Sequence, residues 1–82
     1  MYIYIINIIT RADKTISRTE HYFSTYEKAV NWWESQKSYT IKRAKFCEGG
    51  LRVILNQVEL DTNQVETQQT LLKMSGNELL QQ

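Results

Sequence analysis

The chain has 82 residues, of which 41% are hydrophobic and 23% are charged, a composition that argues for one globular domain and against global disorder. The single cysteine, Cys47, excludes an internal disulfide and suits a reducing compartment, so we expect a cytoplasmic protein. A domain of this size buries only about 60–65% of its unfolded surface, and self-association would relieve that marginal stability. We therefore expect that the protein can form a homodimer.

The first segment, from Tyr2 to Ile9, is an unbroken run of Ile and Tyr that is typical of a β-strand. Both of its faces are mostly apolar, because Ile3, Ile5 and Ile9 alternate with Tyr and Ile side chains on the other side. Such a strand belongs inside a sheet, or it offers one apolar face to a partner. The run lacks a basic leader and is too short to span a bilayer, so we expect neither a signal peptide nor a membrane helix.

After the polar break at residues 11–14, Thr15 to Phe23 is rich in Thr, Ser and aromatic residues and is predicted to form a second strand. Its apolar side is interrupted by Arg18 and Glu20. Because charged side chains discourage unwanted pairing, we expect this segment to be an edge strand.

Ser24 to Glu27 has the spacing of a capping box and predicts the start of a helix that extends to about Gln36. The side chains that share one face of this helix are Tyr26, Ala29, Val30 and Trp33. This stripe should cover one face of the sheet, whereas Trp32 lies on its flank.

Two further strands are predicted from Tyr39 to Glu48 and from Leu51 to Leu60, joined by a tight turn at Gly49–Gly50. Asp61–Asn63 resembles another turn, and Val65 to Met74 fits either a fifth strand or a helix, with Thr and Val favouring the strand. A second capping-box spacing occurs at Ser75–Glu78.

These segments predict an α+β fold, in which an antiparallel sheet of four to five strands carries one amphipathic helix on one face. The predicted order is ββαββ, followed by a strand or a short helix. Residues 1–74 should form a single domain, and residues 75–82 a short C-terminal tail or helical turn.

The sequence contains no recognisable constellation for catalysis, metal binding or phosphate-loop chemistry. His21 and Cys47 could formally make a nucleophilic pair, but no orienting group or oxyanion site is indicated, so a strand histidine and a packed thiol are the better interpretation. We expect neither an enzyme nor a bound cofactor or metal ion.

Charge is distributed unevenly along the chain. Residues 1–56 hold nine Lys and Arg against five acids, a net charge of +4, and residues 57–82 hold one Lys against four acids, a net charge of −3. On the predicted third and fourth strands, Arg43, Lys45 and Arg52 would share a face as a three-cation stripe. Such a stripe could contact an acidic protein or nucleic-acid phosphates, although it lacks the interleaved aromatics of an RNA-binding sheet.

Trp32 is a candidate interface residue, because tryptophan is over-represented among binding hot spots and this one lies outside the stripe. The predicted partner-binding residues are therefore Trp32, Arg43, Lys45 and Arg52. A protein partner is the leading interpretation, and a nucleic-acid-binding regulator that uses the basic strand face is the alternative.

A ββαββ chain of this size, which opens on residues 2–5 (Tyr-Ile-Tyr-Ile) and carries two tryptophans in the segment 26–33, resembles the small accessory proteins of tailed phages. The resemblance covers residues 1–60 in element order, and no motif is shared residue for residue. It implies a non-enzymatic protein that acts in host takeover or counter-defence, by binding and inhibiting a host enzyme, toxin or defence component in the host cytoplasm.

Overall fold

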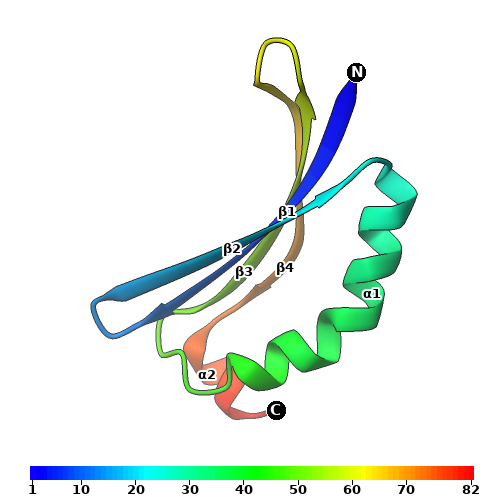
Figure 1. The fold of residues 1–82 in the computed structure, drawn as a ribbon. Helices are drawn as coiled ribbons and strands as arrows, with labels where there is room; N and C mark the ends of the chain where they lie inside the picture. The colour runs from blue at the N-terminus through cyan, green and yellow to red at the C-terminus, as the bar shows by residue number, and fades with distance from the viewer.

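The structure, a computed structural model, describes residues 1–82 in full. It consists of a four-stranded antiparallel sheet with two helices packed beside it (Figure 1). The elements are β1 (Tyr2–Ala12), β2 (Thr15–Phe23), α1 (Tyr26–Arg43), β3 (Gly50–Glu59), β4 (Gln64–Met74) and α2 (Gly76–Leu80). The strands lie in the order β2-β1-β3-β4. The predicted α+β class, with one main helix and a final short helix, is confirmed.

Strand β1 lies inside the sheet, paired with β2 on one side and with β3 on the other, and β2 is an edge strand, as the sequence predicts. Alternate side chains of β1 point to opposite faces. Ile6 is fully buried in the core with Val53 and Leu55 of β3, whereas Ile5 and Ile9 project from the other face. The two faces of β1 therefore have different environments, although both are apolar in sequence.

Helix α1 packs on the sheet through the predicted stripe. Ala29 and Trp33 are buried, and Val30 packs against the same core, while Tyr26 is 47% exposed at the rim. The helix is capped one residue later than predicted, because the Thr25 hydroxyl accepts a hydrogen bond from the Lys28 amide at 3.2 Å.

The predicted strand from Tyr39 to Glu48 is wrong, because α1 continues to Arg43. The apolar stripe of the helix continues through Ile41, which packs on the core, to Ala44, which is 2% exposed. No glycine or proline interrupts this stretch, and Lys42 and Arg43 place positive charge at the negative end of the helix dipole. Burial along the helical stripe thus outweighs the local β preference of Tyr39, Thr40 and Ile41.

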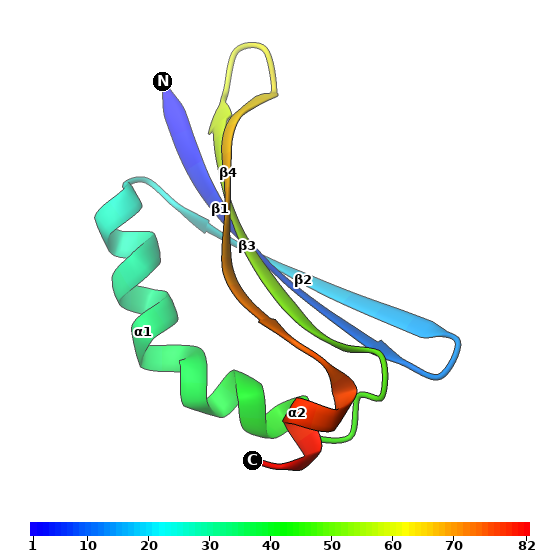
Figure 2. The same cartoon turned by 180° about the vertical axis from the view of Figure 1, so that it is seen from behind.

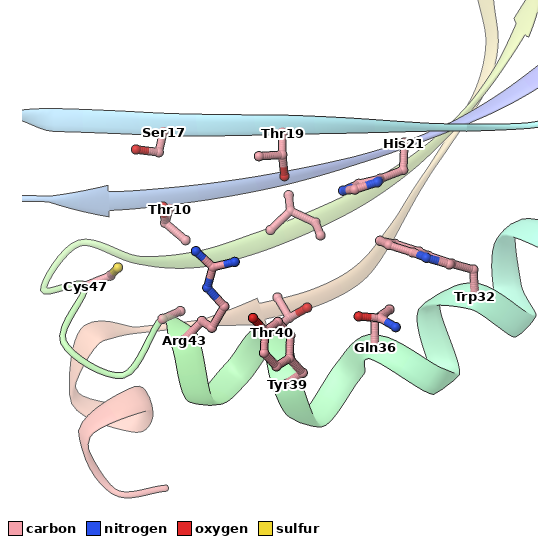
Figure 3. A pocket seen from close by; sticks show the side chains of 12 residues that line it. Thr10, Ser17, Thr19, His21, Trp32, Gln36, Tyr39, Thr40, Arg43 and Cys47 are labelled. Atoms are coloured by element: carbon pink, nitrogen blue, oxygen red, sulfur yellow. The ribbon is translucent and has the colours of Figure 1, made fainter.

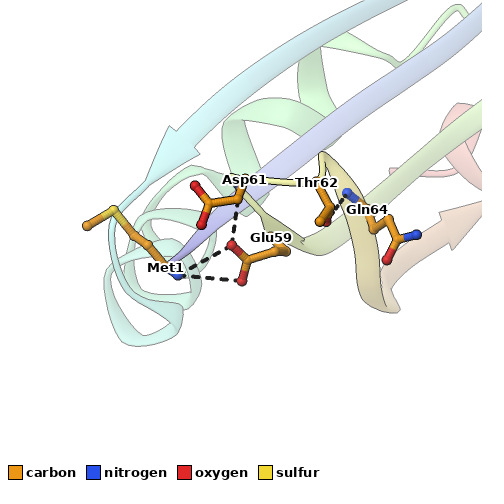
Figure 4. A network of polar contacts seen from close by, with 5 residues as sticks. All are labelled: Met1, Glu59, Asp61, Thr62 and Gln64. Carbon is orange, nitrogen blue, oxygen red and sulfur yellow. Dashed lines mark hydrogen bonds and ion pairs between the residues drawn. The ribbon is translucent and has the colours of Figure 1, made fainter.

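The predicted hairpin across Gly49–Gly50 is also wrong, since no strand precedes it. Gly50 instead begins β3 with a φ of +99°, a conformation that favours glycine. Strand β3 pairs with β4, so the predicted fifth strand is confirmed, and the predicted turn lies between these two strands. At this turn the Glu59 carboxylate accepts from the Asp61 amide at 3.2 Å and lies 3.4 Å from the Met1 ammonium (Figure 4).

The C-terminal segment docks on the core. The predicted capping box at Ser75 is confirmed, because Ser75 and Glu78 exchange hydrogen bonds of 3.0 and 3.2 Å. Leu79 of α2 is fully buried in the same core cluster as Ala29 and Trp33 of α1. Both helices therefore lie on one side of the sheet (Figure 2), and no element of the chain covers the other side.

Candidate functional site

We define the open face as the side of the sheet opposite α1 and α2. Its apolar side chains are Ile3, Ile5 and Ile9 of β1, Ile16 and Tyr22 of β2, Ile54 and Val58 of β3, and Val65 of β4. Neighbouring strands shield Ile54 to 6% exposure, but Tyr22 remains 59% exposed. Asn7 lies between Ile5 and Ile9 on the same face, so the apolar side chains are interspersed with polar ones, and grouped apolar side chains that no element covers often mark a binding surface.

Three cations cross one end of the open face in a single row. Ile9 pairs with Arg18 on one side and with Arg52 on the other, and Arg52 pairs with Lys73 of β4. We call Arg18, Arg52 and Lys73 the cation row. The only ion pair in the structure, between Met1 and Glu59, lies at the opposite end of the strands, so all three charges are free of carboxylate partners. Arg52, Lys73 and Arg11 also line a shallow hollow of about 280 Å³.

Away from the cation row, the open face carries the further polar groups of Asn56, Tyr22 and Glu20. The Oδ1 atom of Asn56, which lies across from Ile5, is buried without a hydrogen-bond partner. The Tyr22 hydroxyl donates to Glu20 at 2.6 Å, and this bond to a carboxylate raises the pKa of Tyr22. Glu20 lies two residues from Arg18 on the same strand, and its hydrogen bond directs it towards Tyr22.

The predicted stripe of Arg43, Lys45 and Arg52 does not exist, because Arg43 ends α1 and Lys45 follows it in a turn. Lys45 lies over the ring of Phe46, 5.8 Å from its centroid. Of the three, only Arg52 lies on the open face. Sequence reasoning missed Arg18 and Lys73, which the strand pairing brings into one row with Arg52, Lys73 directly beside it and Arg18 across Ile9.

Arg43 and Trp32 belong to a second site, on the helix side of the sheet. There α1, β1 and β2 enclose a cleft of about 400 Å³, which we call the helix–sheet cleft. Figure 3 shows Thr19 and His21 of β2 pointing towards α1, and Arg43 reaching back towards the strands. Trp32 is partly buried, because its ring centroid lies 4.3 Å from that of His21 and 5.4 Å from that of Phe23. The predicted binding residues are therefore divided between two faces of the molecule.

His21 and Cys47 both line this cleft, but they lie at its opposite ends (Figure 3). The arrangement therefore gives no nucleophile with an adjacent base. No three His, Cys, Asp or Glu side chains are grouped to hold a metal ion. None of the helices has the length and apolar character needed to cross a membrane.

Fold and sites together define a small α+β protein with one open sheet face and one helix–sheet cleft. Comparison with protein-family models, curated proteins and solved structures finds no match to this chain.

Proposed function

We propose that this protein is a small non-enzymatic binding module that holds a protein partner on its open face. The observation that carries this proposal is the group of uncovered isoleucines on the inner strand β1, Ile3, Ile5 and Ile9, which only Asn7 interrupts. The C-terminal segment cannot cover these side chains, because Leu79 anchors it on the other side of the sheet. Because no element of this chain covers these side chains, only another chain can bury them.

The open face also indicates the chemistry of its partner. The cation row lies directly beside Ile9 and has no carboxylate partners, so a complementary surface would present acidic groups next to aliphatic ones. The unpartnered Oδ1 of Asn56 would accept one hydrogen bond from such a surface. We infer that the module acts as an inhibitor of a host or defence protein by occupying an acidic and apolar surface of its target, as the phage accessory proteins it resembles do.

Capture from a host lysate by the immobilised protein, with identification by mass spectrometry, supplies the partner for a quantitative test. Arg52→Glu reverses a charge of the cation row, and Ile5→Thr shortens an apolar contact while keeping a β-branched side chain. Arg52→Glu should weaken binding by more than about tenfold, mainly by faster dissociation, as expected for a charge buried in an interface. Lys37→Glu, which makes the same charge change on the exposed surface of α1, should leave binding unchanged.

Equal losses of affinity from Arg52→Glu and Lys37→Glu would show that only net charge matters, and native binding by both open-face variants would contradict the proposal.

Light scattering at micromolar concentration tests whether a second copy of the chain, and not a foreign protein, covers the open face. A dimer that Ile5→Thr dissociates would place self-association, and not a foreign partner, on the open face.

The cation row itself favours a second candidate, a nucleic-acid-binding regulator. Three phosphate contacts would make the logarithm of the affinity fall with the logarithm of salt concentration at a slope of about −3. An interface centred on Ile5 and Ile9 would depend on salt much less. Retention of a random duplex that is lost on Arg52→Glu but unaffected by Ile5→Thr would favour this candidate over the protein partner.

A further inference from the structure

The helix–sheet cleft has the dimensions of a small-molecule site. Its volume of about 400 Å³ falls within the range of about 300–1,000 Å³ that is usual for ligand pockets. The adjacent rings of Trp32 and His21 form one end, and the floor near the end of α1 is made by Ala44 and Cys47. The cleft lies on the opposite side of the sheet from the open face, so what it binds does not depend on the proposed function.

The polar groups that line the cleft are not used by the protein itself. Thr10 and Ser17 are paired across β1 and β2, and Thr19 follows on the same face of β2. None of these three hydroxyls is hydrogen-bonded to another protein group, and the same is true of the imidazole of His21. A row of free donors along one wall can bind oxygen atoms of a ligand.

Charge in the cleft has one sign. Arg43 is the only residue with a permanent charge among those that line it, and no Asp or Glu does so. The guanidinium lies 5.6 Å from the centre of the Tyr39 ring, and Figure 3 shows it directed towards the strands. Because it has no carboxylate partner, its five N–H donors are available to an anion.

We propose that the helix–sheet cleft binds a small molecule that joins a planar ring to one anionic group, a phosphate or a carboxylate. The anionic group contacts Arg43 and the hydroxyls of Thr10, Ser17 and Thr19. The ring packs on the part of Trp32 that His21 and Phe23 leave exposed, as planar groups do on aromatic side chains. The cleft thus places a charge-binding end and a stacking end within one groove.

Nuclear magnetic resonance titration tests this proposal with adenosine monophosphate as the probe. Adenosine, which lacks the phosphate, and ribose 5-phosphate, which lacks the base, separate the two contributions. The indole signal of Trp32, assigned with Trp32→Phe, should shift on titration. The indole of Trp33 is 3% exposed in the core and serves as an internal control that should not shift.

Adenosine monophosphate should bind more tightly than either half. Arg43→Gln should weaken it by at least about tenfold, to the level of adenosine, because a hydrogen-bonded charge is lost. Arg52→Gln removes the same charge from the open face and should leave the affinity unchanged. A benzoate titration then distinguishes a carboxylate from a phosphate as the preferred anion.

Two results would overturn the proposal. One is a Trp32 signal that does not move at millimolar concentrations of all four probes. The other is binding that is lost with Arg52→Gln and retained with Arg43→Gln, which would assign the anion to the cation row. Amide spectra of both variants that match the native protein establish that neither outcome reflects unfolding.

Discussion

The two adjacent tryptophans provide a direct test of the packing, because one lies in the core and the other lies over an edge strand. Trp33 is 3% exposed, so truncation to alanine removes nearly all of the area that its side chain buries. A tryptophan buries about 150–250 Å², which at about 25 cal/mol per Å² corresponds to about 4–6 kcal/mol as an upper bound. Measured truncations of this kind cost about 3–5 kcal/mol.

That loss is large for this protein. At about 0.05–0.15 kcal/mol per residue, a chain of 82 residues has a free energy of unfolding of about 4–12 kcal/mol. Trp33→Ala should therefore lower the urea midpoint by several molar or unfold the protein in buffer. Trp32→Ala loses the ring contacts with His21 and Phe23 and should cost only about 1–2 kcal/mol.

Urea titration followed by far-ultraviolet circular dichroism measures both variants against the native protein. A Trp33→Ala variant with an unchanged midpoint would refute the packing of α1 on the sheet. A larger loss from Trp32→Ala than from Trp33→Ala would mean that the helix is rotated about its axis and that the cleft is misplaced.

Two further predictions concern the C-terminal helix and the open face. Gly76→Ala would place its Cβ against the carbonyl oxygen of Glu48 and displace α2, so it should lower the free energy of unfolding by about 2–5 kcal/mol, as much as removing Leu79. In the same urea titration the control Asn77→Ala, at an exposed position, should change that free energy by less than about 0.5 kcal/mol. The hydrogen bond to Glu20 raises the pKa of Tyr22 in the folded protein. The stabilisation from this hydrogen bond is therefore fully present below the pKa of Tyr22 in the unfolded chain, about 10, and is lost as the pH rises through the pKa in the folded protein. The ionisation of Tyr22 can be followed by phenolate absorbance, with Tyr22→Phe identifying its share of the signal. Tyr22 should ionise at lower pH in Glu20→Gln than in the native protein, and an unchanged titration would mean that the hydrogen bond does not form in solution.

The elements whose local preference and burial agree could be predicted from sequence. The Ile-rich run at Tyr2–Ile9 forms an inner strand, and the stripe of Ala29 and Trp33 forms a buried helix face. The capping residues Ser75 and Glu78 start a helix where their spacing indicates one. In each of these segments the spacing of apolar or capping residues fits either a strand or a helix but not both, so the sequence indicates one secondary structure only.

Residues 39–48 could not be predicted, because two periodicities compete there. Tyr39, Thr40 and Ile41 favour a strand locally, whereas Ile41 and Ala44 continue the buried stripe of α1. Only the packing of that stripe on β1 and β3 decides between them, and packing is not a property of the segment alone. The error then moved Arg43 from the helix side of the sheet to the predicted basic stripe.

The cation row was missed for a related reason. Arg18, Arg52 and Lys73 are separated by more than 20 residues at each step along the chain, and they become neighbours only through the registers of three strand pairs. A shift of one residue in any of these registers would move a cation to the other face. Because the register depends on the order β2-β1-β3-β4, a prediction that paired different strands could not identify the row.

The two proposed sites lie on opposite faces of the sheet, because consecutive side chains of β1 point to opposite sides. Ile8 of β1 lines the helix–sheet cleft, and Ile9, the next residue, lies in the middle of the cation row. Arg43 and Arg52 consequently act on opposite faces, although the sequence separates them by only nine positions. Substitutions at sites that share no partners have nearly additive effects, so the adenosine monophosphate titration and the partner titration report on different surfaces. Failure of either test therefore leaves the other proposal intact.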